Sequence, residues 1–438
     1  MTTQTILPFV EDYGALRGRL PGEGAGWLEE LREDGMARFT ALGLPTPRVE
    51  AWKYTNLRPL EKVAFRTADA DDGRVSIDRA PSLLPAGTHC HRLVFVNGQF
   101  RADLSALGDL PEGVQLDDLA GLLQSAPDSL EAHLGRIAEG APQAMMALNT
   151  AMMSGGFVLR LGRGVVLHEP IEIVCLGGGA ETALAYHPRN LIVLEDGAQA
   201  TVIEHHDGLG GGPYLANGAT EISLAEKALL RHYKLQAESS RGFHLATLHA
   251  ELAREASYDS FTLSNGARLS RHEIAVRLAG EGAECHLNGA YLMRGEQHFD
   301  ATTVIEHLVP HTTCRETFKG VIDDKARAVF QGRIVVHRGA QKANGHQLSK
   351  ALLLSDQAEI DTKPELEIYA DDVLCSHGAT AGDLDHEALF YLRSRGIPEA
   401  EARAILIEAF LGEAVNAIAA EGLCPALMTS IGHWLADT

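Results

Sequence analysis

The chain has 438 residues, with 38 basic and 59 acidic side chains and a formal net charge of −21. Such an acidic chain without a basic run is unsuited to nucleic acid or to an anionic membrane surface, so we expect neither as a partner. The sequence has no apolar run near the roughly 18 residues of a membrane span and no charged-then-apolar leader. Six cysteines lie far apart without Cys-x-x-Cys spacing, which indicates free thiols in a reducing compartment. We therefore expect a cytoplasmic protein.

A chain of this length exceeds one typical core, so we expect several domains. The patterns below divide it into an N-terminal helical and α+β domain (1–155), a β core (156–380) and a C-terminal helical domain (381–438). In the first domain, an apolar stripe that begins at Trp27 and stops at Gly43 predicts a helix.

Three further features belong to the N-terminal domain. The pair Asn97-Gly98 lies between apolar runs and predicts a β-hairpin, because a tight turn needs the positive φ angles that Asn and Gly accept. The stretch from Leu116 to Asn149 has a helical pattern. Trp52 could stack on a ligand, but a lone aromatic residue more often packs in the core.

A short phrase recurs through the β core: an aliphatic residue, three or four mostly polar residues and an alanine. The alanines lie 30, 28, 27, 43 and 32 positions apart, and a strand-like run follows each one. A repeat of roughly 30 residues is typical of a solenoid, in which each unit buries its apolar face against its neighbours. The alanines are Ala198, Ala228, Ala256, Ala283, Ala326 and Ala358.

The runs between these phrases favour strands over helices. Residues Ser257–Leu263 are rich in β-branched and aromatic side chains and are followed by the turn formers Ser264-Asn265-Gly266. Two or three such strands per repeat predict a mainly β fold, a parallel β-helix or a related β-solenoid. An open β-sandwich remains the alternative.

Three histidines and a cysteine in the β core are residue types that bind metals, but their spacing does not fit a metal site. The four residues are 9, 4 and 3 positions apart, a spacing that no standard zinc finger has, and neighbouring positions of a strand face opposite ways. We therefore expect corner or surface residues here rather than a zinc site. The group is His298, His307, His311 and Cys314.

A strand-like run from Lys363 to Thr380 carries a more informative pair. It places Cys375 and His377 two residues apart, and hence on one face of the strand. A thiolate and an imidazole roughly 6–7 Å apart along a strand can both reach a soft metal ion. Two ligands do not complete a tetrahedral site, so another coil or another chain would supply the rest. Cys375 and His377 are our candidate metal ligands.

The last part of the chain is predicted to be helical, from about Asp385 to Arg395 and again from about Pro398 to Ala420. The second helix is apolar around more than one face, which is wider than a single buried face requires. Either it lies inside a three-helix cap, or a partner protein covers part of it. The candidate partner-binding residues are Ile405, Leu406, Ala409, Phe410 and Leu411.

Several segments resemble the SufB/SufD family of iron–sulfur cluster assembly proteins, in the same order from about Gly43 to Phe410. The last two of them are highly specific. The resemblance implies a right-handed parallel β-helix core flanked by helical domains. The segments are Glu50–Thr55, Arg189–Asp196, Leu287–Leu292, Thr362–Tyr369, Cys375–Thr380 and Phe390–Ile397.

The resemblance also implies a role and partners. Leu392 stands where the SufB form carries a cysteine, so the chain is closer to the SufD form. That form implies a non-catalytic scaffold that pairs with a SufB-like paralogue through the β-helix and binds a SufC-like ABC ATPase through the C-terminal helices. Whether the chain forms a homodimer in isolation stays an open question. It implies His377, with Cys375 beside it, as a ligand of transient iron or an iron–sulfur cluster shared with the paralogue, and no permanently bound cofactor.

Two other functions stay open at this point. A carbohydrate-active enzyme uses the same β-helix fold, but it needs a pair of carboxylates that the motifs do not contain. A SufB-type scaffold that holds the cluster itself is disfavoured by Leu392. The chain has no Gly-rich phosphate loop with Lys and Ser or Thr, so we expect it to hydrolyse no ATP alone.

Overall fold

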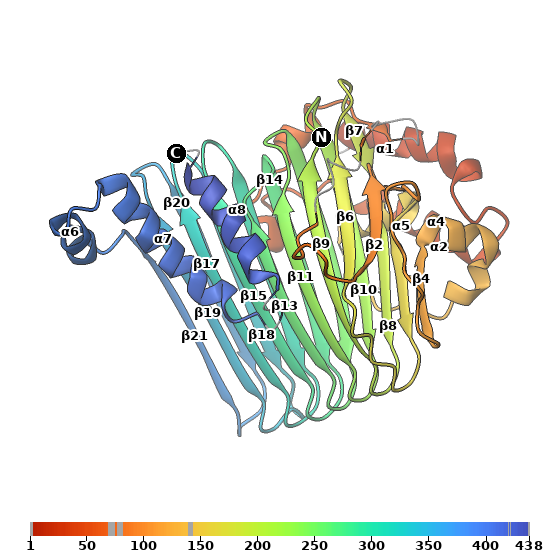
Figure 1. Ribbon diagram of the computed structural model, residues 1–438. Coiled ribbons are helices and arrows are strands. Elements are labelled where there is room, and N and C mark those ends of the chain that lie inside the picture. The colour runs from red at the N-terminus through yellow and green to blue at the C-terminus, as the bar shows by residue number, and fades with distance from the viewer. Residues whose placement is uncertain are drawn as a thin grey trace.

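A computed structural model describes residues 3–68, 75–76, 82–138, 143–418, 420 and 422–436. Within these residues two long β-sheets, one of eleven strands and one of ten, lie face to face (Figure 1). Through the middle of the chain successive strands alternate between the sheets, and each pairs in parallel with the strand one coil further on. This is a parallel β-solenoid, which confirms the predicted mainly β fold class and excludes the open sandwich.

We call the two sheets A and B. Sheet A contains, in spatial order, β20 (Glu359–Ile368), β18 (Arg327–Val336), β16 (His298–His307), β14 (Leu269–Leu278), β12 (Gly242–Leu252), β10 (Tyr214–Leu224), β8 (Arg189–Leu194), β5 (Phe157–Leu161) and β4 (Val114–Asp118), with β7 (Leu184–Tyr186) and β1 (Arg66–Thr67) beside β10. Sheet B contains β21 (Leu374–Gly382), β19 (Asn344–Leu353), β17 (Thr313–Ile322), β15 (Glu284–Met293), β13 (Ser257–Ser264), β11 (Leu229–Ala237), β9 (Gln199–Gly208), β6 (Ile171–Gly177), β2 (His91–Val96) and β3 (Gln99–Phe100).

The repeat alanines lie at corners of the solenoid, where a small side chain lets the chain turn close to the core. All six are at most 7% exposed. The first four, up to Ala283, precede strands of sheet B, whereas Ala326 and Ala358 precede strands of sheet A. The spacing of 43 residues between Ala283 and Ala326 is therefore the point at which the phrase moves to the opposite corner.

The N-terminal predictions are borne out in part. Helix α2 ends where predicted, and Asn97 and Gly98 have φ angles of 49° and 79° in the turn between β2 and β3. The long helical pattern from Leu116 to Asn149 is wrong in its first part, because Val114–Asp118 pairs with β5 as a strand; residues 139–142 lie outside the described residues. The helices are α1 (Thr3–Leu16), α2 (Gly26–Leu42), α3 (Arg58–Glu61), α4 (Leu119–Ser125) and α5 (Ala144–Met152).

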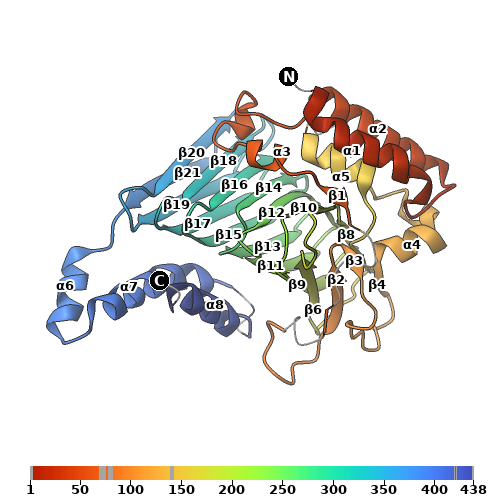
Figure 2. The same ribbon diagram turned by 90° about the horizontal axis from the view of Figure 1, so that it is seen from above.

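The C-terminal helices are α6 (His386–Ser394), α7 (Glu399–Val415) and α8 (Cys424–Ala436). Both predicted helices are present, although α7 ends five residues before Ala420. Figure 2 shows α7 and α8 along sheet B, while α1, α2 and α5 lie on the side of sheet A, so the two helical groups flank the solenoid. No helix among the described residues is long and apolar enough to cross a membrane.

Candidate functional site

The two ends of the solenoid differ. At the first end, antiparallel strands flank the sheets, because β4 pairs with β5 and β3 with β2. At the other end β20 and β21 are the outermost strands, and within the described residues each has one edge without a neighbour. Apolar side chains are exposed there, with Tyr369 at 58% and Leu374 at 69%. Unpaired strand edges beside exposed apolar side chains form a template for another chain.

Cys375 and His377 lie on β21, at this open end. Register places Cys375 beside Gly345 and His377 beside Gln347, and both partners on β19 are buried. Cys375 is half-buried and packs against the main core, whereas His377 is exposed. The two side chains therefore share the inner face of the last strand, as their two-residue spacing predicts.

The predicted single strand from Lys363 to Thr380 is wrong. β20 ends at Ile368 and β21 begins at Leu374, and the chain passes from sheet A to sheet B between them. Burial raises the pKa of the Cys375 thiol, and a hydrogen bond with the Gly345 backbone lowers it by less. In the chain by itself this thiol is therefore protonated at neutral pH, and a metal ion would have to displace its proton.

The four residues that sequence spacing argued against as a zinc set do not come together, although His307 and Cys314 meet. Both of these are completely buried, so the expectation of corner or surface positions is wrong for them. His307 Nε2 lies 3.2 Å from Cys314 Sγ and His307 Nδ1 lies 2.7 Å from Thr312 Oγ1, inside the solenoid. His298 bonds to Thr55 on the outer side of sheet A instead, and His311 is a corner residue. No group of three or more His, Cys, Asp or Glu side chains within the described ranges is arranged to hold a metal ion.

The five residues predicted to bind a partner on α7 have different environments. Ile405 and Ala409 are exposed, and Leu406 and Phe410 are half-buried. Leu411 is completely buried in the cluster that joins α7 and α8 to sheet B, so it is not accessible to a partner. The wide apolar surface of α7 is thus partly explained by its own chain.

Phe410 is held by a buried lysine of the solenoid. Lys319 is 3% exposed, donates to the Phe410 carbonyl oxygen at 2.9 Å and lies 4.8 Å from the centre of the Phe410 ring. Its ammonium group also pairs with Glu413. These contacts fix α7 on sheet B and leave the Ile405 side of the helix free.

Helix α6 stands clear of both sheets (Figure 1). Asp385 caps its first turn by accepting from the backbone N–H groups of Glu387 and Ala388. Phe390 is 73% exposed and Tyr391 is 56% exposed. Two large aromatic side chains exposed on one short helix are unusual, because such rings ordinarily bury their apolar area.

Sequence reasoning missed a polar cluster inside the solenoid. Glu204 accepts from His232 Nε2 at 2.6 Å and lies 2.7 Å from His206 Nε2, with Lys234 Nζ at 3.3 Å. Burial would raise the pKa of Glu204, but Lys234 and the two imidazoles outweigh it and hold this pKa well below its usual range. The cluster borders an internal cavity of about 40 Å³, into which Cys175 also faces. Room of this size suits a few water molecules.

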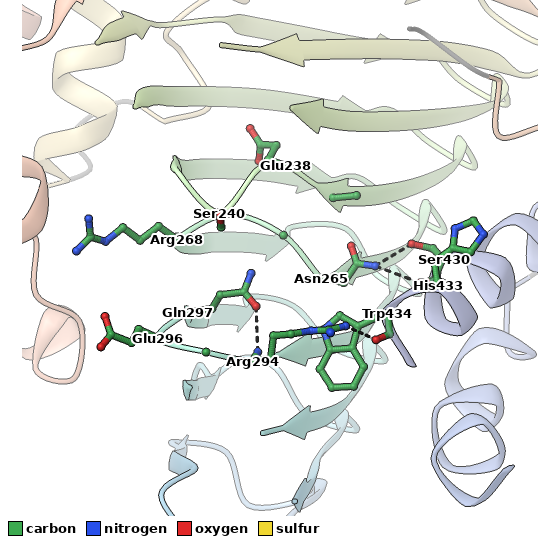
Figure 3. A pocket seen from close by; sticks show the side chains of 13 residues that line it. Glu238, Ser240, Asn265, Arg268, Arg294, Glu296, Gln297, Ser430, His433 and Trp434 are labelled. Carbon is green, nitrogen blue, oxygen red and sulfur yellow. Dashed lines mark hydrogen bonds between the residues drawn. The ribbon is translucent and has the colours of Figure 1, made fainter. Parts of the chain in front are cut away.

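A larger groove lies between the solenoid corners and α8, with a volume of about 850 Å³. Figure 3 shows Asn265 directed toward Ser430, where its Nδ2 donates to Oγ at 2.8 Å. Arg294 lies against the Trp434 ring, 4.2 Å from its centre, and bonds to the Trp434 carbonyl oxygen. These contacts attach α8 to the corners. We therefore interpret the groove as part of the surface where α8 packs on the solenoid, not as a ligand site.

Trp52 is a packing residue, as expected for a lone aromatic. It is 5% exposed, and the Arg271 guanidinium lies 3.9 Å from the centre of its ring. Arg271 also donates to the Ala51 carbonyl oxygen at 2.8 Å and pairs with Asp300. Arg271 thus fastens the segment around Trp52 to sheet A, together with Gln331, which donates to the same Ala51 carbonyl oxygen at 3.1 Å.

Comparison with known proteins agrees with this architecture. A model of the SufBD core domain of the SUF system for iron–sulfur cluster assembly matches residues 176–410, and a model of the SufBD N-terminal region matches residues 8–173. The chain belongs to the SufBD family. Membership supports a role in iron–sulfur cluster assembly.

Individual SufBD relatives are similar over nearly their whole length. The iron–sulfur cluster assembly protein SufD of Escherichia coli is 34% identical over 400 residues, which is 90% of this chain and 90% of the relative. A SufBD family protein of Synechocystis is 34% identical over 402 residues, covering 89% and 87%. SufD of Bacillus subtilis is 27% identical over 419 residues, covering 92% and 93%. The resemblance to the SufD form is therefore confirmed.

Proposed function

We propose that this chain is a non-catalytic scaffold subunit of the Suf iron–sulfur cluster assembly complex. It pairs with a SufB-like paralogue at the open end of the solenoid and with a SufC-like ABC ATPase at its C-terminal helices. The observation that carries the proposal is the position of Cys375 and His377 on the inner face of the last, uncovered strand. There a second chain would both continue the sheets and enclose the two side chains.

The donor set suits iron as a transient substrate. Thiolate and imidazole are soft or intermediate ligands for iron and iron–sulfur clusters, and two of them leave positions for ligands of the paralogue. A site that only a second chain completes can also release its contents when the two chains shift. The mechanism therefore needs no permanently bound cofactor.

Replacing His377 with alanine is expected to abolish most of the iron and acid-labile sulfide that the complex retains after anaerobic reconstitution. His377 is exposed, so its removal leaves no cavity and the complex with the SufB-like and SufC-like partners should still form. The measurement is iron and sulfide content per purified complex.

His386 provides a matched control, because its side chain is 82% exposed on nearby α6. His386→Ala should retain the cluster content of the wild type. Equal cluster content in the His377→Ala complex would show that the ligands lie elsewhere.

The ATPase contact is assigned to the free side of α7. Replacing both Ile405 and Ala409 with glutamate is expected to weaken binding of the SufC-like ATPase at least tenfold, because it places two charges in an apolar contact. Both positions are exposed, so stability should not change. Titration calorimetry of the two purified proteins measures the affinity.

A glutamate at Asn416, an exposed residue just beyond the same helix, is the control and should leave the affinity within about twofold of wild type. If the double variant binds as the wild type does, α7 is not the docking surface. In that event the exposed aromatic residues of α6 become the next position to test.

A further inference from the structure

The interior beneath the open end contains a column of polar side chains. Glu316 on β17, Gln347 on β19 and His377 on β21 are successive register partners, one coil apart. Glu316 is 1% exposed and Gln347 is 3% exposed, whereas the next partner further inward is Leu287, which packs in the apolar core. A carboxyl and an amide thus lie directly behind the candidate ligand His377.

The first two members of this column are joined. Gln347 Nε2 donates to Glu316 Oε2 at 2.7 Å. The Gln347 side chain extends across the interior over Gly332 of sheet A, where any Cβ would lie only 1.8 Å from Gln347 Nε2. Glycine at this position therefore makes room for the amide.

The column is incomplete in the chain by itself. Gln347 Oε1 is buried and has no hydrogen-bond partner among the described residues. A buried acceptor without a donor costs roughly 1–3 kcal/mol, so its retention calls for an explanation. The neighbour of Gln347 toward the open end is His377, whose ring can offer an N–H group.

We propose that Gln347 and Glu316 are positioning residues for His377. When one ring nitrogen of His377 binds iron or a cluster, the other ring N–H donates to the Gln347 carbonyl oxygen. Through the Gln347 amide, the Glu316 carboxylate then supplies negative charge that balances the bound cation. Such a layer behind a ligating histidine sets its tautomer and orientation and strengthens it as a ligand. This inference rests on the proposed function of His377.

The charge of Glu316 responds to pH near neutrality. Burial raises the pKa of Glu316 to about 7, and hydrogen bonds from Thr303 and Gln347 lower it by less. The titratable groups around it are Cys314 on its own strand, Cys285 on β15 and His307 at the end of β16. Burial raises the pKa values of both thiols and lowers the pKa of His307 to about 4, so all three are neutral at pH 7. A cation at His377 would favour ionised Glu316 and release its proton to solvent.

The test measures anaerobic Fe(II) binding by the complex of the full chain with its SufB-like and SufC-like partners, at pH 6 and pH 8. With Glu316→Gln the affinity is expected to fall about tenfold at pH 8, the size that a lost partner of a ligand produces. At pH 6 the loss should shrink to about twofold or less, because wild-type Glu316 is then mostly protonated.

Glu251→Gln is the matched control, because it removes a half-exposed carboxylate from β12, away from the open end. It should change the affinity less than twofold at either pH. An equal loss for Glu316→Gln at both pH values, or no loss at pH 8, would overturn the inference.

His377→Ala separates the inference from the function on which it rests. If that variant binds Fe(II) as the wild type does, the proposed function fails. If it loses Fe(II) binding while Glu316→Gln shows no pH-dependent loss, the proposed function stands and only the positioning role of Gln347 and Glu316 is wrong. Thermal melting at pH 8 checks folding, and Glu316→Gln should melt no lower than wild type, because it replaces a buried acid by a neutral group of the same shape.

Discussion

Acidification from pH 7 to pH 4 is expected to unfold the solenoid. Burial lowers the pKa of His187 to about 3 and the pKa values of His206, His249 and His307 to about 4. In the unfolded chain each would titrate near 6.5, so between these values the unfolded state binds more protons. Above pH 6.5 these histidines are neutral in both states and do not lower the free energy of unfolding. As the pH falls toward 4, each lowers it by about 3 kcal/mol, and together they lower it by a value on the order of 10 kcal/mol.

One carboxyl acts in the opposite direction. Because its pKa is raised to about 7, Glu316 gains a proton more readily in the folded state, and acidification from pH 7 to 4.5 stabilises the fold by about 3 kcal/mol. The stability lost through the four histidines exceeds the stability gained through this one carboxyl. Glu204 and Glu238, whose pKa values are lowered, add to the loss below pH 4.5.

Circular dichroism during a pH titration measures the acid transition. His249→Gln removes one of the groups that must be protonated and should shift the midpoint to lower pH. His311→Gln, at a side chain that is 58% exposed, should leave the midpoint unchanged. A chain that keeps its full β signal at pH 3.5 would contradict this account.

The solenoid is predictable from sequence because its corners repeat. A small residue is required wherever the chain turns against the core, and the alanines up to Ala283 mark one corner in every coil. The recurring aliphatic–polar–alanine pattern does not predict the move to the other corner at Ala326, because both corners accept this pattern. The helical pattern that begins at Leu116 fails for a related reason: pairing with β5 outweighs a local helical pattern.

The candidate site is predictable only along a single strand. A spacing of two residues places Cys375 and His377 on one face whatever the rest of the chain does. The column behind His377 joins residues 30 and 31 positions apart, and a register shift of one residue would turn Gln347 to the outside. Register between coils depends on corner lengths, which sequence patterns do not fix to one residue. Glu316 and Glu204 therefore look like solvated strand residues in the sequence.

Replacing Asp300 with alanine is expected to destabilise the protein by about 3–5 kcal/mol, because it leaves a buried cation without its main partner. Arg271 and Asp300 are 1% and 0% exposed, and they form a direct ion pair. Burial opposes the charge of Arg271, but Asp300 and Glu273 outweigh burial and raise its pKa. Equilibrium unfolding in urea at pH 7.5 measures the loss.

Glu359→Ala is the contrasting control. Its pair with Arg327 also joins neighbouring strands, but both side chains are more than half exposed, so the loss should be at most about 1 kcal/mol. Similar losses for the two variants would mean that the Arg271 pair contributes no more than a surface ion pair.

The effect of Asp300→Ala should also be local. Thr55 donates its hydroxyl to Asp300, and the Ala51 carbonyl accepts from Arg271, so this pair supplies two of the contacts that fasten the segment around Trp52 to sheet A. Without Asp300, the Arg271 side chain keeps Glu273 as a partner but loses the carboxylate that also binds Thr55. Limited proteolysis should then cut between Arg48 and Arg58 before the solenoid itself is cleaved. Asp300→Asn, which keeps the shape and an oxygen acceptor for Thr55, should resist such cutting better than the alanine variant, because only the charge is lost.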